Sequence, residues 1–307
     1  MQVWSTALPD NVIEAGKASG AIIFDPNASS TFKNFDGYTW SIRYGDGSAA
    51  SGNVGRDNVK IGDITVEGQA IELADTLSTQ LQNQTSSCGL LGLGFGSINT
   101  VKPTPVNTPL ENMILQKDIP ADKALFSCYL GSYKDADDPD HGESFYTFGG
   151  IWEPAIPQGK QISYTPVDNS DGFWKFSAPS VVINGNTLNL GSNMAIADTG
   201  TTLIMASDRV CEAFYGAIEG AIYSRSEMGW VFPKSVPTEA LPLITFAVGH
   251  RGFTIEKEHL AFAEIDGTEW VFGGIQSRGS LAFDILGDVF LKSVYAVSDN
   301  TSASPQY

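Results

Sequence analysis

The sequence predicts a mainly β protein, all-β apart from a few short helices, that folds as two lobes. Its length and composition support this, because 307 residues, 42% of them hydrophobic, suffice to bury large cores. Its 32 glycines and 15 prolines divide the chain into many short segments, as expected for strands joined by turns. Two apolar segments that end on a glycine, residues 89–92 and 285–287, occur once in each half. We expect an N-terminal lobe over residues 1–153 and a C-terminal lobe over residues 154–307.

The charge and the apolar runs argue against two classes of partner. With 18 lysines and arginines against 35 aspartates and glutamates, the net charge is −17, which repels the phosphates of a nucleic acid. The longest apolar run, residues 240–248, contains a proline and is too short to span a bilayer. We therefore expect no nucleic acid partner and no membrane partner.

The sequence predicts no cofactor and no metal site. Its cysteines, Cys88, Cys128 and Cys211, are odd in number, form no Cys-x-x-Cys pair and are expected to be neutral or buried thiols. Its histidines do not cluster along the chain. The acidic run at residues 135–143 contains a proline and lacks the glycine of a calcium loop, which favours a solvated hairpin loop.

The tripeptide Asp198-Thr-Gly200 is the candidate centre of the chemistry. An apolar stretch at residues 194–197 precedes it and another at residues 203–205 follows it. This pattern predicts a strand, a tight turn and a second strand, with the carboxylate of Asp198 presented at the turn.

Residues 42–48 predict a β-hairpin whose tip carries polar side chains. Its glycines favour this interpretation, because a short hairpin loop needs backbone positions with positive φ that glycine adopts most easily. An ordinary exposed hairpin is the alternative. The tip residues are Tyr44, Gly45, Asp46, Gly47 and Ser48.

Together these segments resemble the pepsin-like aspartic proteases, and most closely their fungal secreted members of the penicillopepsin and endothiapepsin kind. The likeness extends over nearly the whole chain and includes residues 24–31, 167–174 and 273–277. It implies a bilobal pepsin-like fold with a cleft between the lobes. Each lobe of that fold gives one Asp-Thr-Gly turn and one apolar-apolar-Gly segment.

The resemblance also implies roles for single residues. Asp198, Tyr44 and Asp46 are the candidate catalytic residues, since the hairpin tip of the family is a flap that closes over the substrate. The candidate substrate-binding residues are Gly45, Gly47, Ser48, Gly200, Thr201, Thr202 and Gln2. The implied partner is a small molecule or a peptide in the cleft between the lobes.

The first catalytic aspartate of the family is missing from the sequence. Asp198 precedes Gly287 by 89 residues (287 − 198), and the same offset before Gly92 leads to position 3 (92 − 89), where no aspartate stands. Residues 1–4 resemble the tetrapeptide that follows the first Asp-Thr-Gly turn. Gln2 then occupies the position of the tryptophan that hydrogen-bonds the flap tyrosine. Asp10, the next carboxylate, lies in a turn-like stretch and is not expected to substitute.

Both ends of the family fold are expected to be cut. The segment after residue 297 is polar and stops before the last strand of the family, so the sheet between the lobes should be short. Its exposed strand edges are liable to pair with another chain, which makes a homodimer an option. The family disulfide is also absent, since its positions correspond to Lys234 and Val271.

Three functions remain open. In the first, Asp198 and a nearby tyrosine perform acid–base catalysis on a small molecule, in a dehydration, isomerisation or cyclisation of fungal secondary metabolism. The second is an aspartic-type endopeptidase whose second aspartate comes from outside this chain segment or from a second copy. The third is a catalytically inactive protein that binds a peptide or another ligand. The location is expected to be intracellular if Met1 is the natural start, since no signal peptide follows it, and secreted otherwise.

Overall fold

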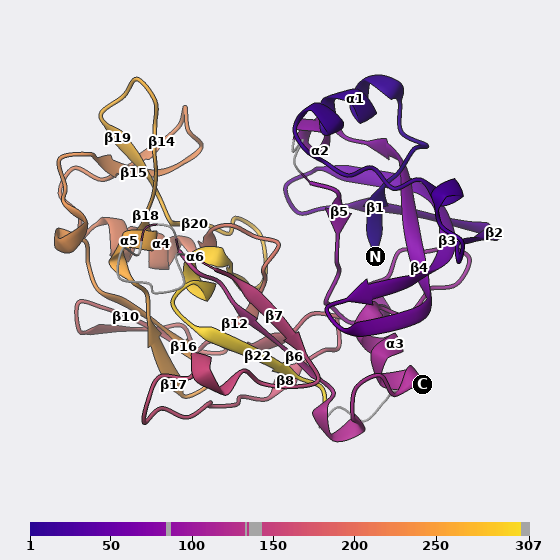
Figure 1. The fold of residues 1–307 in the computed structure, drawn as a ribbon. Coiled ribbons are helices and arrows are strands. Elements are labelled where there is room, and N and C mark those ends of the chain that lie inside the picture. Colours follow the sequence, from indigo (N-terminus) through magenta and orange to yellow (C-terminus); the bar gives the residue numbers. More distant parts are fainter. Residues whose placement is uncertain (84–86, 133, 135–142, 302–307) are drawn as a thin grey trace. The chain divides into compact units, whose positions relative to one another are not determined.

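The structure is a computed structural model that describes residues 1–83, 87–132, 134 and 143–301 (Figure 1). The chain divides into two compact units, each of which is described by itself. The first unit contains Met1–Ala124 and Ser170–Gly172, and the second contains Leu125–Asn169 and the described chain from Phe173 onward. The lobe limits expected from the sequence, residues 1–153 and 154–307, stay a prediction about folding units.

Strand residues outnumber helical residues in both units, which confirms the mainly β prediction. The strands of the first unit are β1 (Gln2–Trp4), β2 (Lys33–Arg43), β3 (Ala49–Ile61), β4 (Ile64–Leu77) and β5 (Gly89–Leu90). The strands of the second unit are β6 (Leu125–Tyr129), β7 (Phe145–Phe148), β8 (Val167–Asp168), β9 (Lys175–Ser177), β10 (Ser180–Ile183), β11 (Asn186–Asn189), β12 (Met194–Ala197), β13 (Ile204–Ala206), β14 (Ile222–Ser224), β15 (Gly229–Pro233), β16 (Ile244–Val248), β17 (Arg251–Thr254), β18 (Ala261–Glu264), β19 (Trp270–Gly273), β20 (Ile275–Ser277), β21 (Asp284–Leu286) and β22 (Tyr295–Asp299).

The helices are short and lie between the strands. The α-helices are α1 (Asp10–Ala18), α2 (Thr79–Asn83), α3 (Pro109–Gln116), α4 (Asp208–Tyr215), α5 (Lys257–Leu260) and α6 (Asp288–Leu291). Single 3₁₀ turns are η1 (Pro26–Ala28), η2 (Gly96–Ile98), η3 (Ala121–Lys123), η4 (Glu153–Ala155) and η5 (Thr238–Ala240). Among the described residues, no helix has the length and apolar character needed to cross a membrane.

The first unit is organised by one sheet with the order β2-β3-β4-β1-β5. The long antiparallel pair of β3 and β4 forms its centre, and the short strand β1 joins β4 in parallel, with Gln2 opposite Glu72. Trp4 and Trp40 are almost completely buried on this sheet, where they form the core with Val54, Ala74 and Val101. Strand β1 is thus held from both sides, by β4 and by the antiparallel strand β5.

The second unit contains four sheets. Their orders are β20-β13-β21-β12-β9-β8, β11-β10-β16-β17, β14-β15-β19-β18 and β22-β6-β7. In the first of them, β21 runs between β12 and β13, parallel to β12 and antiparallel to β13. The predicted strand at residues 194–197 is confirmed by β12, whereas the second predicted strand begins one residue later, at Ile204.

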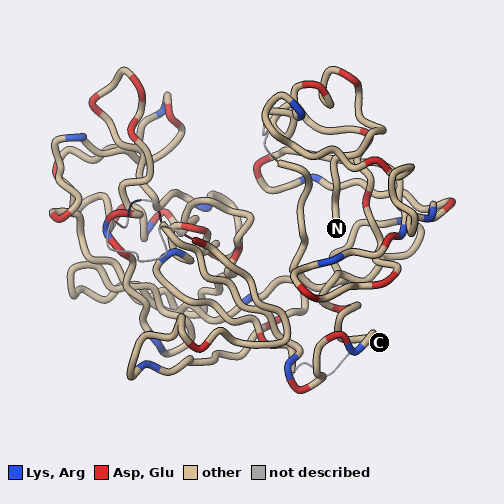
Figure 2. The backbone as a smooth tube through the Cα atoms, viewed as in Figure 1, with Lys and Arg blue, Asp and Glu red and all other residues tan. Residues whose placement is uncertain are grey.

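Lys234 and Val271, which correspond to the positions of the family disulfide that this chain lacks, lie at the β15–β19 ladder. Lys234 directly follows β15 and donates its backbone N–H to the Glu269 carbonyl at 2.9 Å, while Val271 pairs with Phe232. In place of a disulfide, the Lys234 ammonium lies 3.0 Å from the exposed Glu264 carboxylate, a surface ion pair of small energetic value. Cys88 is an exposed free thiol, whereas Cys128 and Cys211 are buried free thiols. Charged residues of both signs are scattered along both units (Figure 2).

Tyr215 at the end of α4 anchors the core of the second unit. Its ring is 1% exposed and stacks on Trp230, with 5.0 Å between the ring centroids and 3° between the planes. Its hydroxyl donates to the Ile275 carbonyl at 2.6 Å. Because Ile275 begins β20, which pairs with β13, this bond links the helix to the sheet that carries the Asp198 turn.

We predict that Tyr215→Phe lowers the free energy of unfolding by about 1–3 kcal/mol, because it leaves the buried Ile275 carbonyl without its donor. Urea unfolding measures the change. Tyr223→Phe is the matched control, since Tyr223 is half exposed and packs on the same tryptophan, and it should change stability by less than about 0.5 kcal/mol. Equal losses in the two variants would contradict the anchoring role of the hydroxyl.

Candidate functional site

The carboxylate of Asp198 is oriented by its own turn. Asp198 follows the last residue of β12 and donates its backbone N–H to the Leu286 carbonyl of β21 at 3.2 Å. Its Oδ1 accepts from the Gly200 N–H at 2.9 Å, and its Oδ2 accepts from the Thr201 hydroxyl at 2.6 Å. Both oxygens are therefore held in fixed directions while the residue stays partly exposed. The arrangement suits a carboxylate that exchanges a proton with a bound molecule.

Gly287 allows the chain after β21 to approach the Asp198 turn closely. A Cβ at this position would lie 2.1 Å from the Thr201 carbonyl oxygen and 2.4 Å from that of Leu203, so a side chain does not fit. The next two residues, Asp288 and Val289, donate their N–H groups to the carbonyls of Thr201 at 2.8 Å and Thr202 at 3.0 Å. The apolar segment that ends at residue 287 thus supports the turn.

A polar anchor fixes the start of β21. Asp284 is 1% exposed and accepts from the Arg278 guanidinium at 2.7 Å and from the Asn193 amide at 2.6 Å. Burial raises the pKa of Asp284, and its two donors oppose that rise. Since removal of a donor would leave a buried charge uncompensated, the three side chains act together to fix the strand.

Asp288 is a second carboxylate beside the turn, and the sequence analysis did not select it. Burial raises the pKa of Asp288 to about 6, the Lys292 ammonium lowers it, and the Asp198 carboxylate raises it. Its position directly after the apolar-apolar-Gly segment was a usable signal. Tyr146 on β7 was also missed: its hydroxyl hydrogen-bonds the Thr199 side chain, and burial raises its pKa to about 12.

In the first unit, residues 44–48 form the turn between β2 and β3. The Tyr44 N–H donates to the Ser48 carbonyl at 2.8 Å, and the Gly47 N–H donates to the Tyr44 carbonyl at 3.0 Å. Gly47 has a φ of 85°, in the left-handed region that favours glycine, whereas the φ of Gly45 lies outside it. The conformational need for glycine therefore falls on residue 47 alone.

Asp46 stabilises this turn from within. Its Oδ1 accepts from the Ser48 N–H at 2.9 Å and from the Ser48 hydroxyl at 2.7 Å. These hydrogen bonds lower the pKa of Asp46, so its carboxylate is ionised at neutral pH. Ser48, a predicted binding residue, is 2% exposed and acts as the donor to Asp46.

Tyr44 donates its hydroxyl hydrogen to Oε1 of Gln2 on β1. Burial raises the pKa of Tyr44 to about 12, with further contributions from the carboxylates of Glu72 and Asp46. At neutral pH the phenol is therefore protonated and its hydrogen is committed to Gln2. Gln2 thus provides the contact to the tip tyrosine that the resemblance attributes to a tryptophan.

The strand pairing repeats between the units. In the second unit, Ile204 pairs in parallel with Ile275 of β20 and antiparallel with Leu286, the residue before Gly287. In the first unit, β1 has a parallel partner and an antiparallel partner in the same way, with Gln2 opposite Leu90.

Continuing this register by one residue sets Met1 opposite Leu91, the residue before Gly92, so that Met1 is the counterpart of Ile204. Ile204 follows Asp198 by six residues (204 − 198), and no residue of 1–307 lies six positions before Met1, so the register agrees with the resemblance of residues 1–4 to the tetrapeptide after the first turn. The position of the first catalytic aspartate stays a prediction. Asp10 is exposed in α1.

The predicted site residues gather in two groups. Asp198, Gly200, Thr201 and Thr202 belong to one turn of the second unit. The other predicted residues, Gln2 and 44–48, belong to the first unit. Their assignments as catalytic or substrate-binding residues stay predictions.

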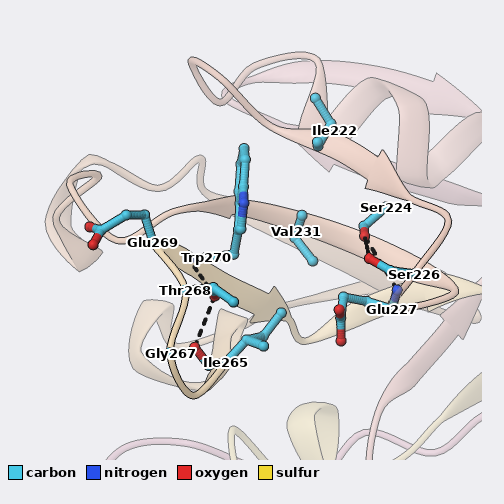
Figure 3. A pocket seen from close by; sticks show the side chains of 10 residues that line it. All are labelled: Ile222, Ser224, Ser226, Glu227, Val231, Ile265, Gly267, Thr268, Glu269 and Trp270. Carbon is cyan, nitrogen blue, oxygen red and sulfur yellow. Dashed lines mark hydrogen bonds between the residues drawn. The ribbon is translucent and has the colours of Figure 1, made fainter.

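A pocket of about 450 Å³ lies elsewhere in the second unit, on the sheet of β14, β15, β19 and β18 (Figure 3). The side chains of Trp270, Val231 and Ile222 line it together with polar residues of the two adjoining turns. None of the predicted site residues lines this pocket.

Comparisons with known proteins connect the site to a family. The family described as eukaryotic aspartyl protease matches residues 5–304. Aspergillopepsin-1 of Aspergillus fumigatus (strain CBS 144.89 / FGSC A1163 / CEA10) is 39% identical over 289 residues, which cover 94% of this chain and 68% of that protein. Aspartic protease pepA of Arthroderma otae is 39% identical over 298 residues, with 93% and 71% covered. Penicillopepsin-3 of Penicillium janthinellum is 37% identical over 298 residues, with 97% and 69% covered.

We predict that Asp288→Asn stabilises the protein above pH 6 and not below pH 4. The pKa of Asp288 is raised from 3.8 to about 6, so the wild type loses stability as the pH rises through this range and the carboxyl ionises beside Asp198. The neutral amide avoids that loss. Thermal unfolding from pH 3.5 to about 7.5 measures it, with the exposed Asp266→Asn as control. Parallel curves for wild type and Asp288→Asn would contradict the prediction.

We predict that Gln2→Leu and Tyr44→Phe each destabilise the protein and that their effects are not additive. Each variant removes one partner of the same hydrogen bond, so the double variant should recover about 0.5–1.5 kcal/mol relative to the sum. Urea unfolding of the four proteins gives this coupling. Additive losses would show that the contact between the two side chains carries no energy.

Proposed function

Since the chain belongs to the eukaryotic aspartyl protease family, we propose that it is an aspartic-type endopeptidase in which Asp198 is one of two catalytic carboxylates. The observation that carries the proposal is the Asp198 turn. Both carboxylate oxygens accept hydrogen bonds within it, and β21 supports it between β12 and β13. The family implies a peptide as the substrate.

The chemistry needs two carboxylates. When two such groups lie about 3 Å apart they cannot both ionise, so they share one proton. One then accepts a proton from the attacking water while the other donates a hydrogen bond to the carbonyl of the scissile peptide bond. The proton belongs to the pair, and a single aspartate cannot perform both tasks at once.

Two sources of the second carboxylate fit the proposal. One source is a segment that would precede β1 in the same chain, and the repeated register supports it. The other source is Asp198 of a second copy. Asp10 does not fit, because it is an exposed residue of α1 and not part of a turn between two strands.

The two other functions stay open as hypotheses. Acid–base catalysis on a small molecule would use Asp198 with a tyrosine, yet the hydrogen of Tyr44 is committed to Gln2 and its pKa is about 12. No observation favours secondary metabolism. A ligand-binding protein without activity would keep the same turn and would differ only in turnover.

We predict that the protein cleaves a denatured protein substrate at acid pH and that pepstatin, a transition-state peptide inhibitor, blocks the cleavage. Asp198→Asn should lower the rate by at least about 10²–10⁴-fold, because an amide cannot exchange the proton. The control is Asp10→Asn, which should keep the wild-type rate. Absence of cleavage at every pH would contradict the proposal, and inhibitor binding without cleavage would favour the binding protein.

A mixing experiment then assigns the second carboxylate. Wild type and Asp198→Asn are unfolded together in varied proportions and refolded, and the activity is measured. A linear dependence on the wild-type fraction assigns both carboxylates to one chain. A quadratic dependence assigns them to two copies.

A further inference from the structure

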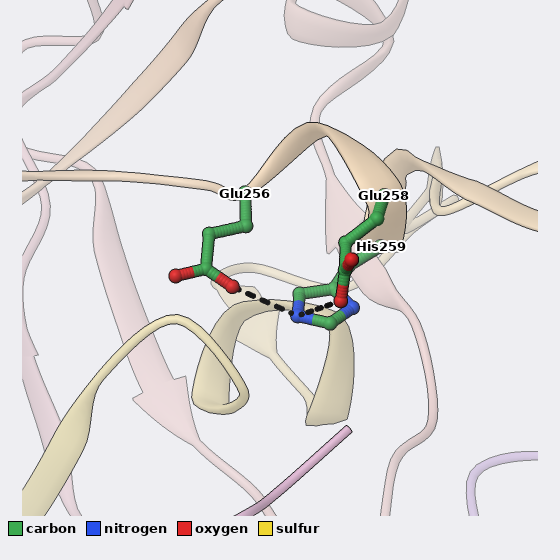
Figure 4. A group of neighbouring side chains, drawn as sticks. All are labelled: Glu256, Glu258 and His259. Atoms are coloured by element: carbon green, nitrogen blue, oxygen red, sulfur yellow. Dashed lines mark ion pairs between the residues drawn. The ribbon is translucent and has the colours of Figure 1, made fainter. Parts of the chain in front are cut away.

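Three side chains around α5 form a cluster of metal-binding groups in the second unit. Nε2 of His259 lies 3.3 Å from Oε2 of Glu256 and 3.5 Å from Oε1 of Glu258 (Figure 4). The two carboxylates reach the same ring nitrogen from different sides. All three ligand atoms lie within 4.8 Å of one another. The Asp198 turn does not include any of them.

The distances fit a shared cation better than hydrogen bonds. An N–H···O bond joins heavy atoms at about 2.7–3.2 Å, and one ring N–H cannot point at two oxygens at once. Zinc binds imidazole nitrogen and carboxylate oxygen at about 2.0–2.2 Å, and neighbouring ligands of a tetrahedral ion are then roughly 3.3–3.6 Å apart. Two of the three separations, 3.3 and 3.5 Å from Nε2 of His259, lie in that range, and the third, between the two carboxylate oxygens, is at most 4.8 Å.

Burial pre-forms one side of the cluster and leaves the other open. The His259 side chain is 3% exposed, that of Glu258 28% and that of Glu256 56%. Glu258 also lines a pocket of about 550 Å³. The buried imidazole is a fixed ligand, and the exposed Glu256 can close over the ion with a small movement.

The surrounding charges set a limit on the affinity. Two carboxylates favour a divalent cation, but the Lys134 ammonium donates to the backbone carbonyls of Glu258, Ala261 and Phe262 at 3.4, 2.7 and 3.1 Å. A nearby ammonium opposes cation binding, so one positive charge partly offsets the two negative ones.

We propose that His259, Glu256 and Glu258 bind a divalent transition metal ion, with Zn²⁺ as the best match to one nitrogen and two oxygen donors. Water completes the tetrahedral shell. The ion braces α5, because it links Glu256, ahead of the helix, to Glu258 and His259 within it. The backbone of Glu256 also connects this segment to the chain just after α6, since the Glu256 N–H donates to the Ser293 hydroxyl at 3.1 Å.

Titration with Co²⁺, followed by displacement with Zn²⁺, tests the site, because tetrahedral Co²⁺ absorbs visible light. We expect one equivalent to bind the wild type and to raise the melting temperature. Glu256→Gln should weaken binding at least about 10-fold, the lower end of what loss of a mere supporting residue costs at a metal site. Glu256 is exposed, so this variant should fold, which far-ultraviolet circular dichroism verifies.

Matched controls exclude other binding places. Glu264→Gln lies on the same pocket outside the cluster, and Cys88→Ser removes the exposed thiol; both should bind as the wild type does. Unchanged affinity in Glu256→Gln and Glu258→Gln would place the ion elsewhere and overturn the proposal. So would absence of binding to the wild type.

Discussion

The candidate site depends on a backbone approach that only glycine permits. Strand β21 lies between β12 and β13, and Gly287, the residue after it, lies close to the carbonyls of Thr201 and Leu203. This contact lets the N–H groups of the next two residues, Asp288 and Val289, donate to backbone carbonyls of the turn. A side chain at residue 287 would push the Asp198 turn away from the end of β21. The direction of the Asp198 carboxylate therefore depends on a residue far away in sequence.

The side chains around this contact have two roles: some fix the orientation of β21, and one places a second charge near Asp198. Asp284 and its two donors hold one end of β21, and Asp288 follows its other end. Asp288 is half buried and lies near enough to Asp198 for the two charges to interact. The site of the second unit therefore contains two carboxylates whose charges interact. Asp288 acts on Asp198 through its charge, and its side chain is not part of the Asp198 turn.

The sequence predicted the β class and the strand, turn and strand around Asp198, because both depend on local patterns. It did not single out Asp288 or Tyr146, whose roles arise from contacts with the distant residues 198 and 199. The cluster at His259 escaped notice because it contains a single histidine, and the histidines do not cluster along the chain.

The bond between Tyr44 and Gln2 has a direction, and the direction decides what the hairpin tip offers to a ligand. An indole N–H can only donate, so a tryptophan beside the tyrosine would leave the phenolic hydrogen free for an outside acceptor. Gln2 accepts through Oε1 and takes up that hydrogen. The Tyr44 oxygen then has only lone pairs to present. Through this atom the tip can accept a hydrogen bond but has no hydrogen left to donate.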